Sequence, residues 1–219
     1  MDKKTSTALE RLDDILPLLS GLRSLSSEDA ALYCNLLNSY VQRGRALARI
    51  EVDERVGNAA LALDNLVNSK LIVLDADGNP AGAYPFTSQE REHKVHINGV
   101  TVHCMCALDA LAVSPMFNVP AVIESECRIT GKQIHIEQNG ISIDKGTLDA
   151  WLGINWGAAA NDIVCAESLC LEMMFLANET VAKEWLQESP ETREIFDLSS
   201  AVDLSAAFFV PLAEHCRKS

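Results

Sequence analysis

The sequence has no long hydrophobic run and few basic residues. None of its apolar stretches reaches the roughly 18 residues that a membrane-spanning helix needs, and the N-terminal segment is too polar for a signal peptide. Eighteen Lys and Arg residues against 31 Asp and Glu residues leave a net charge of −13. A field of that sign repels a polyanion unless one face is locally basic, and no basic stripe is evident. We therefore expect a cytoplasmic protein that binds neither a membrane nor a nucleic acid.

Common metal and nucleotide motifs are also missing. The chain contains no C-x-x-C, H-E-x-x-H or G-x-x-x-x-G-K-[ST] pattern, so it carries none of the usual zinc or P-loop signatures. Three histidines, His93, His96 and His103, fall near one predicted hairpin. Their proximity leaves a metal site or a Cys–His nucleophile open, although histidines on strands are more often surface residues.

Cysteine, in contrast, is frequent. The seven copies are Cys34, Cys104, Cys106, Cys127, Cys165, Cys170 and Cys216. An odd number in a chain without an export signal favours thiols kept for metal or catalytic chemistry, or buried in the core, over a disulfide framework. We expect no role for Cys34, which lies in a predicted helix, or for Cys216 near the C-terminus.

Length and composition predict one large or two small domains with a sizeable core, because the chain has 219 residues and is 48% hydrophobic. Residues 1–87 are mainly helical by pattern. Apolar residues recur at helical spacing from 28 to 41, after candidate caps at 26–27 and before Gly44. A second helix is predicted over 58–69.

A turn cluster at residues 75–80 separates two β-rich segments, 70–74 and 81–86. Helices followed by such a hairpin resemble a winged helix-turn-helix. Because the presumed recognition helix has no cluster of Lys and Arg, we favour a structural role for this unit over DNA binding.

The pattern becomes β-rich over residues 88–219. Predicted strands cover 95–97 and 100–102 around the Asn98-Gly99 turn, 121–125 and 133–137; predicted helices cover 107–113, ending before Pro115, 179–187, and 200–215, interrupted near Pro211. Segment 168–176 is apolar on both faces, so periodicity does not separate strand from helix. The predicted fold class is α+β: a helical, winged-helix-like region, 1–87, packed on a mixed or antiparallel sheet domain with flanking helices, 88–219.

The most chemically promising pair is Cys106 and Asp109. If a helix begins near Met105, the two side chains project from neighbouring points of its first turn. A helix N-terminus stabilises a thiolate and lowers the pKa of a cysteine, whereas a nearby carboxylate opposes this unless the two groups share a proton. An ionisable carboxyl within an apolar run is costly to bury, so we favour a functional pair over a structural one.

Cys170 is the second candidate, because the apolar run around it suits a soft metal or an apolar ligand. Cys165 stands five residues earlier. Neither a helix nor a strand brings residues at that spacing to one face, so the two are not expected to pair. Cys127, before the Thr130-Gly131 turn, is expected to be structural.

In order and spacing, these segments resemble the organomercurial (alkylmercury) lyases. The matching segments are C-A-L-D at 106–109 after the 98–99 turn, S-x-C-x-x-T-G at 125–131, and S-L-C at 168–170 with the apolar run that follows. The resemblance covers most of residues 28–210, including the helical region that ends in the segment 75–86.

This resemblance implies an active site of Cys106, Cys170 and Asp109 that cleaves a carbon–mercury bond by protonolysis, giving a hydrocarbon and Hg(II) without an organic cofactor. The two thiolates and the aspartate would hold mercury as substrate and as bound product. Thiolates suit this soft ion, and Asp109 would carry a proton from a thiol to carbon. Residues 173–175 would form an apolar wall for the alkyl or aryl group.

The implied partners are an organomercurial substrate and, as acceptors of Hg(II), mercuric reductase or cellular thiols; the oligomeric state stays open. The chain departs from the family at Leu171, where some members carry a further cysteine, and over residues 141–160. A non-catalytic soft-metal-binding or thiol-sensing protein on the same scaffold is therefore the alternative hypothesis.

Overall fold

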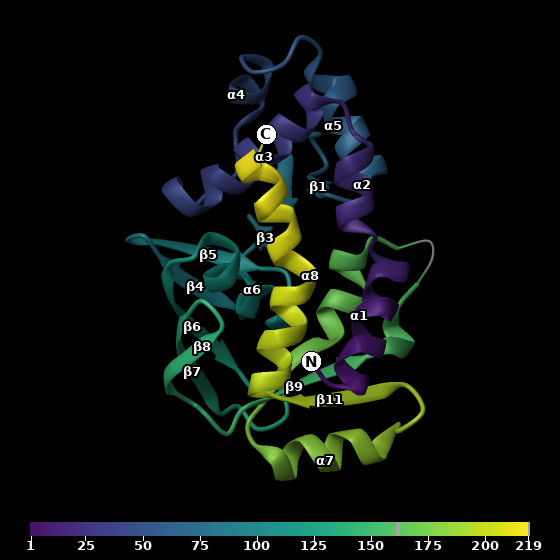
Figure 1. Cartoon of the computed structure of the whole chain (residues 1–219), viewed down its shortest axis with the longest axis vertical. Helices are drawn as coiled ribbons and strands as arrows, with labels where there is room; N and C mark the ends of the chain where they lie inside the picture. The colour runs from purple at the N-terminus through teal and green to yellow at the C-terminus, as the bar shows by residue number, and fades with distance from the viewer. Residues whose placement is uncertain (161–162, 219) are drawn as a thin grey trace.

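Helices and antiparallel strands build the α+β fold of the computed structural model (Figure 1), which describes residues 1–160 and 163–218. The helices are α1 (Lys3–Ile15), α2 (Leu18–Ser24), α3 (Ser27–Arg43), α4 (Arg49–Asp53), α5 (Ala59–Asn68), α6 (Ala107–Phe117), α7 (Glu179–Glu188) and α8 (Leu198–Lys218). The strands are β1 (Ile72–Leu74), β2 (Pro80–Ala83), β3 (Phe86–Thr87), β4 (Lys94–Ile97), β5 (Val100–Cys104), β6 (Pro120–Glu126), β7 (Gln133–Asn139), β8 (Ser142–Gly146), β9 (Trp151–Asn155), β10 (Met173–Leu176) and β11 (Arg193–Asp197). No helix among these residues is both long and apolar enough to cross a membrane.

Local signals predict α3, α5 and the hairpin of the N-terminal region, whereas α1, α2 and α4 are not predicted individually. The Ser26 hydroxyl accepts a hydrogen bond from the Asp29 N–H at the start of α3, and Gly44 ends the helix with a φ of 70°. Asn58 caps α5 in the same way. The predicted hairpin forms as β1 and β2, and it continues through β3 into the larger sheet, where β3 pairs with β5. The winged-helix assignment and a domain boundary at residue 87 stay predictions.

The larger sheet has the order β1-β2-β3-β5-β4-β6-β7-β8. The Asn98-Gly99 hairpin is confirmed, with both turn residues at positive φ. The prediction that the next helix ends before Pro115 is wrong, because α6 continues to Phe117. Pro115 offers no N–H to the Leu111 carbonyl one turn earlier. The side-chain amide of Gln138 on β7 donates to that carbonyl instead, at 2.9 Å.

The last helix, α8, runs through the centre of the molecule (Figure 1) and is not interrupted at Pro211, contrary to the sequence prediction. Buried residues on both sides of the proline, Phe208 and Leu212 among them, outweigh the single missing hydrogen bond. Helix α6 packs along α8, and the Ser205 hydroxyl donates to the Leu108 carbonyl at 2.8 Å.

The C-terminal end of α8 reaches α3, where Cys216 and Cys34 form a disulfide. The expectation that neither cysteine has a role is therefore wrong. The two residues are 182 positions apart, so no local pattern indicates that they meet. The bond links α3 to α8, the last helix of the chain.

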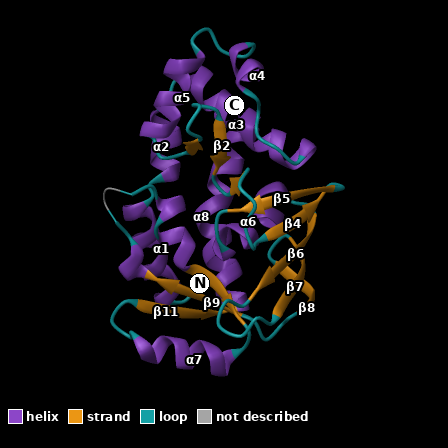
Figure 2. Cartoon of the chain, turned by 180° about the vertical axis from the view of Figure 1, so that it is seen from behind, coloured by secondary structure: helices purple, strands orange, loops and turns teal. Residues whose placement is uncertain are grey.

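The smaller sheet has the order β10-β9-β11 and lies between α7 and α8 (Figure 2). The ambiguous segment 168–176 divides into two conformations: a short 3-10 helix, Leu169–Glu172, followed by β10. All four residues of β10 are buried, because the strand pairs with β9 and also contacts both α6 and α7. The start of β10 lies against the start of α6, because the Met173 sulfur contacts that of Cys106, the N-cap of α6.

Replacing Gln138 with Met is expected to destabilise the fold by about 1–3 kcal/mol, because the Leu111 carbonyl loses its donor. In a Pro115→Ala background the new N–H at position 115 can serve that carbonyl, so the penalty should be smaller. Urea unfolding of the two single variants and the double variant measures the coupling. Strictly additive effects would contradict this account of α6.

The Cys216→Ser variant is expected to lose about 2–5 kcal/mol of unfolding free energy, because a bond across so long a loop restricts the unfolded chain strongly. Urea unfolding without reductant measures the loss. Reductant should bring the wild type to the level of the variant and leave the variant unchanged. Equal unfolding midpoints for the wild type and the variant, both without reductant, would show that the bond does not form.

Candidate active site

The first turn of α6 holds two of the predicted site residues. Cys106 is the N-cap with extended backbone, and the helix begins at Ala107, as predicted. The Asp109 N–H donates to the Cys106 sulfur at 3.4 Å. A cysteine thus fills a position where Ser, Thr, Asp or Asn is usual, and its thiol lies over the carboxyl-bearing turn.

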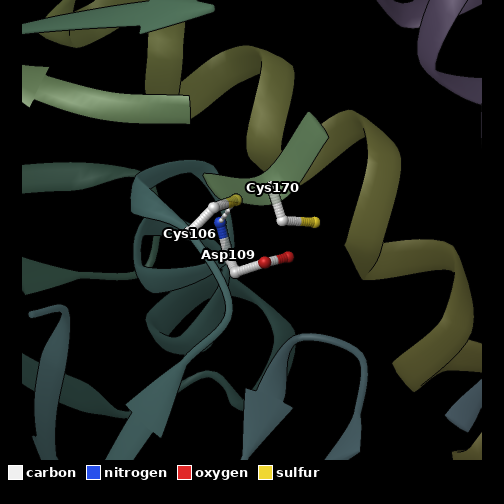
Figure 3. A group of neighbouring side chains, drawn as sticks. All are labelled: Cys106, Asp109 and Cys170. Atoms are coloured by element: carbon white, nitrogen blue, oxygen red, sulfur yellow. Dashed lines mark hydrogen bonds between the residues drawn. The ribbon is translucent and has the colours of Figure 1, made fainter. Parts of the chain in front are cut away.

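Cys170 joins this pair from the 3-10 helix that precedes β10. Figure 3 shows Cys106 and Asp109 projecting from the start of α6, with the Asp109 carboxyl and the Cys170 sulfur pointing to the same side. Each residue offers a ligand atom, two sulfurs and a carboxylate oxygen, and these atoms all lie within 4.8 Å of one another. Two thiols and a carboxyl are therefore within reach of a single soft ion.

The cluster is almost completely shielded from solvent: Cys106 is 1% exposed, Asp109 2% and Cys170 3%. The Cys106 thiol contacts the Met173 sulfur at 3.7 Å. Alternation along β10 places Met174 on the opposite face of the strand from Met173. Of the apolar wall expected at residues 173–175, Met173 is therefore the residue that contacts the Cys106 thiol. The Asp109 Oδ2 atom has no hydrogen-bond partner in the part of the chain that the structure describes.

Burial dominates the ionisation of Cys106 and Asp109. It raises the pKa of Asp109 to about 7, against the smaller effects of the Cys106 hydrogen bond and the more distant Arg91 charge. Burial likewise raises the pKa of Cys106 to about 11. The backbone N–H of Asp109 in the first helical turn lowers the pKa of this thiol and the Asp109 carboxylate raises it, as expected, but desolvation outweighs the lowering. Near neutral pH the site therefore holds thiols beside a carboxyl that gains or loses a proton readily.

Cys165 lies against Cys170, with 3.6 Å between the two sulfurs. The sequence prediction that they do not pair is wrong. Ser168, at φ −134° and ψ −97°, separates two 3-10 turns, so the segment follows neither regular geometry. Hydrogen bonding with Cys106 and Cys165, together with burial, raises the pKa of Cys170. Hydrogen bonding with Cys170 lowers the pKa of Cys165.

Arg91 positions the two halves of the site. Its guanidinium Nη1 donates to the Met105 carbonyl at 3.0 Å and to the Ala166 carbonyl at 2.9 Å. One side chain thus ties the residue before Cys106 to the turn that carries Cys165. Sequence reasoning missed Arg91, because it lies in the charged stretch 88–94, where the sequence does not distinguish an arginine that bonds to the core from a solvated one.

The other candidates lie apart from this cluster. Cys127 is fully buried, and its carbonyl accepts from the N–H groups of Thr130 and Gly131, which agrees with a structural role. His93 Nδ1 is hydrogen-bonded to the Ser125 hydroxyl at 2.8 Å. Within residues 1–160 and 163–218, the Cys106 group is the one set of three potential ligands close enough to share an ion. The histidines therefore form no such site there.

Comparison with known families identifies the family of the chain. Residues 86–210, more than half of the chain, match the family model described as alkylmercury lyase. The chain belongs to the alkylmercury lyase family. The match contains all three clustered residues, and membership makes the chain an organomercurial lyase.

A solved structure shares the fold of this alkylmercury lyase family member. It is described as the crystal structure of the mercury-bound form of MerB2, with a TM-score of 0.73 and 21% sequence identity. The alignment covers 92% of this chain and 98% of that chain. No curated protein sequence matches the chain.

An Asp109→Asn variant tests the raised pKa through stability. Between about pH 4 and pH 7 the folded wild type holds a proton that the unfolded chain releases, so its stability falls as pH rises, by roughly 1.4 kcal/mol per unit. The stability of the variant lacks this dependence on pH. The difference in unfolding free energy should therefore shift in favour of the variant as the pH rises to about 7. Urea unfolding across this range measures the difference, and a difference independent of pH would refute the raised pKa.

Proposed function

We propose that this chain cleaves the carbon–mercury bond with Cys106 and Cys170 as mercury-binding thiols and Asp109 as the proton carrier. The convergence of the three side chains within 4.8 Å, in a site closed to water, supports the proposal most directly. Mercury in organomercurials is a soft centre, for which sulfur is the preferred ligand. A buried carboxyl beside it supplies the acid–base function.

The proposed reaction needs only these residues. One thiol binds mercury and displaces the leaving ligand X of the organomercurial, which departs with the proton of that thiol as HX. Asp109, as carboxylate, takes the proton of the second thiol, whose sulfur then bonds to mercury. Protonated Asp109 delivers that proton to carbon as the carbon–mercury bond breaks. The products are the hydrocarbon and Hg(II) held by two thiolates, and Asp109 returns to its starting state.

The raised pKa of Asp109 suits both of its proton transfers, from the thiol and to carbon. A group with a pKa of about 7 accepts and donates a proton at neutral pH with little free-energy cost in either direction. Burial also keeps water from competing as the acid. The scheme uses no organic cofactor.

Hg(II) held by two thiolates leaves the site by exchange with further thiols. We therefore assign cellular thiols or mercuric reductase as the acceptors, in a cytoplasmic setting where thiols are abundant. The apolar contact of Met173 with Cys106 offers a surface for the hydrocarbon group.

The test uses the purified chain with phenylmercury and excess small-molecule thiol, and benzene is measured by gas chromatography. The wild type should release many equivalents of benzene. Cys106→Ser and Cys170→Ser should each lower turnover by at least about a thousandfold, because each removes a mercury ligand and a proton source.

Cys127→Ser is the matched control, since it removes a buried thiol outside the cluster and should lower stability while turnover persists. If the wild type only binds one equivalent of mercurial and releases no benzene, the chain is a soft-metal-binding protein. Full turnover by Cys170→Ser would show that the second thiol is assigned wrongly.

A further inference from the structure

A cavity of about 420 Å³ lies next to the buried cluster. Its lining residues are Asp14, Ile15, Leu16, Val67, Lys70, Ile72, Tyr84, Ala159, Ala160, Ile163, Val164, Cys165 and Ser168. This volume lies within the range of small-molecule sites. Cys106, Asp109 and Cys170 are not among the lining residues, so the cavity stops short of the reacting groups.

Cys165 stands between the cavity and the cluster. It lines the cavity and its sulfur lies 3.6 Å from that of Cys170. The other four free cysteines are buried, whereas Cys165 is partly exposed. It is thus the free thiol that a molecule in the cavity meets first.

Tyr84 gives a second indication that Cys165 is the reactive thiol of the cavity. Its side chain lines the cavity and is 1% exposed. Hydrogen bonding with Cys170 and, to a smaller extent, with the Tyr84 side chain lowers the pKa of Cys165. A thiol with a lowered pKa forms the thiolate, which is the form that binds a metal, more readily.

We propose that Cys165 is a capture thiol, which binds the organomercurial in the cavity and passes it to Cys170. The inference rests on the function proposed above and extends it with a step before bond cleavage. In the first exchange, R–Hg–X and the Cys165 thiol give R–Hg–S(Cys165) and HX, where X is a thiolate or halide. In the second, R–Hg–S(Cys165) and the Cys170 thiol give R–Hg–S(Cys170) and the Cys165 thiol.

The short distance between the Cys165 and Cys170 sulfurs makes the second exchange possible. The Cys170 sulfur can bond to mercury while Cys165 still holds it, and the Cys170 proton moves to the departing Cys165 sulfur along their existing contact. No water, cofactor or oxidant is needed. Mercury then reaches a cluster that is at most 3% exposed without being released into solution.

Stopped-flow absorbance with p-hydroxymercuribenzoate follows capture, because formation of the mercury–sulfur bond changes the ultraviolet spectrum. The wild type should show a fast phase of one equivalent. Cys165→Ser and Cys165→Ala should slow this phase by at least about tenfold and lower kcat/KM for phenylmercury in proportion, with kcat nearly unchanged. A fast phase in both variants equal to that of the wild type would overturn the proposal.

Cys127→Ala is the matched control: it removes a free thiol outside the cavity and should keep the fast phase. Thermal unfolding of each variant checks that the fold is intact. Because Cys165 is only partly buried, its replacement should leave the unfolding temperature close to that of the wild type.

The Cys170→Ser variant separates this step from the chemistry. It should capture one equivalent of p-hydroxymercuribenzoate at the wild-type rate and retain it on Cys165, as located by mass spectrometry of peptides. Label found on Cys106 would overturn the capture role. Should the wild type release no benzene, the proposed function fails, yet the fast phase and the labelled position still decide the role of Cys165.

Discussion

The burial of one carboxyl beside two thiols is the constraint on which the site depends. Asp109 lies in the first turn of a helix enclosed by α8, the larger sheet and β10, and one of its oxygens has no partner among the residues that the structure describes. An ionised carboxyl there is costly, and this cost, rather than a specific partner, raises its pKa to about 7. Burial raises the pKa of Cys106, and hydrogen bonding together with burial raises that of Cys170, so both neighbouring sulfurs are protonated before mercury binds. Mercury binding makes each thiol release its proton, and the buried carboxyl is the group placed to receive it and pass it to carbon.

The surrounding fold supplies two separate supports for that arrangement. The start of α6 is fixed through α8, which packs along its length and is itself tied to α3 by the Cys34–Cys216 disulfide. The segment with Cys165 and Cys170 has irregular backbone and is held by side chains from other parts of the chain: Arg91 donates to the Ala166 carbonyl and Arg128 donates to the Leu171 carbonyl. Cys106 thus lies at the start of a packed helix, while Cys165 and Cys170 lie on an irregular segment held by side-chain hydrogen bonds.

The sequence predicts those structural features that depend on neighbouring residues. The caps of α3, the turn at 98–99 and the i to i+3 relation of Cys106 to Asp109 all follow from nearby residues, and the structure has them. Contacts between residues far apart in the sequence are not predicted. The disulfide, the Arg91 hydrogen bonds and the pairing of Cys165 with Cys170 depend on tertiary packing or irregular backbone, for which periodicity has no signature. Cys170 was a candidate by its apolar surroundings, but family resemblance supplied its role.

The titration of Asp109 tests the central claim most directly. Carbon-13 NMR of the chain labelled at the aspartate carboxyl groups resolves each acid as pH is varied, and the Asp109→Asn variant identifies the resonance concerned. The account predicts one aspartate carboxyl with a pKa near 7, which is missing from the variant. If every aspartate in the wild type titrates below about pH 5, as exposed carboxyls do, the buried proton carrier does not exist and the account is contradicted.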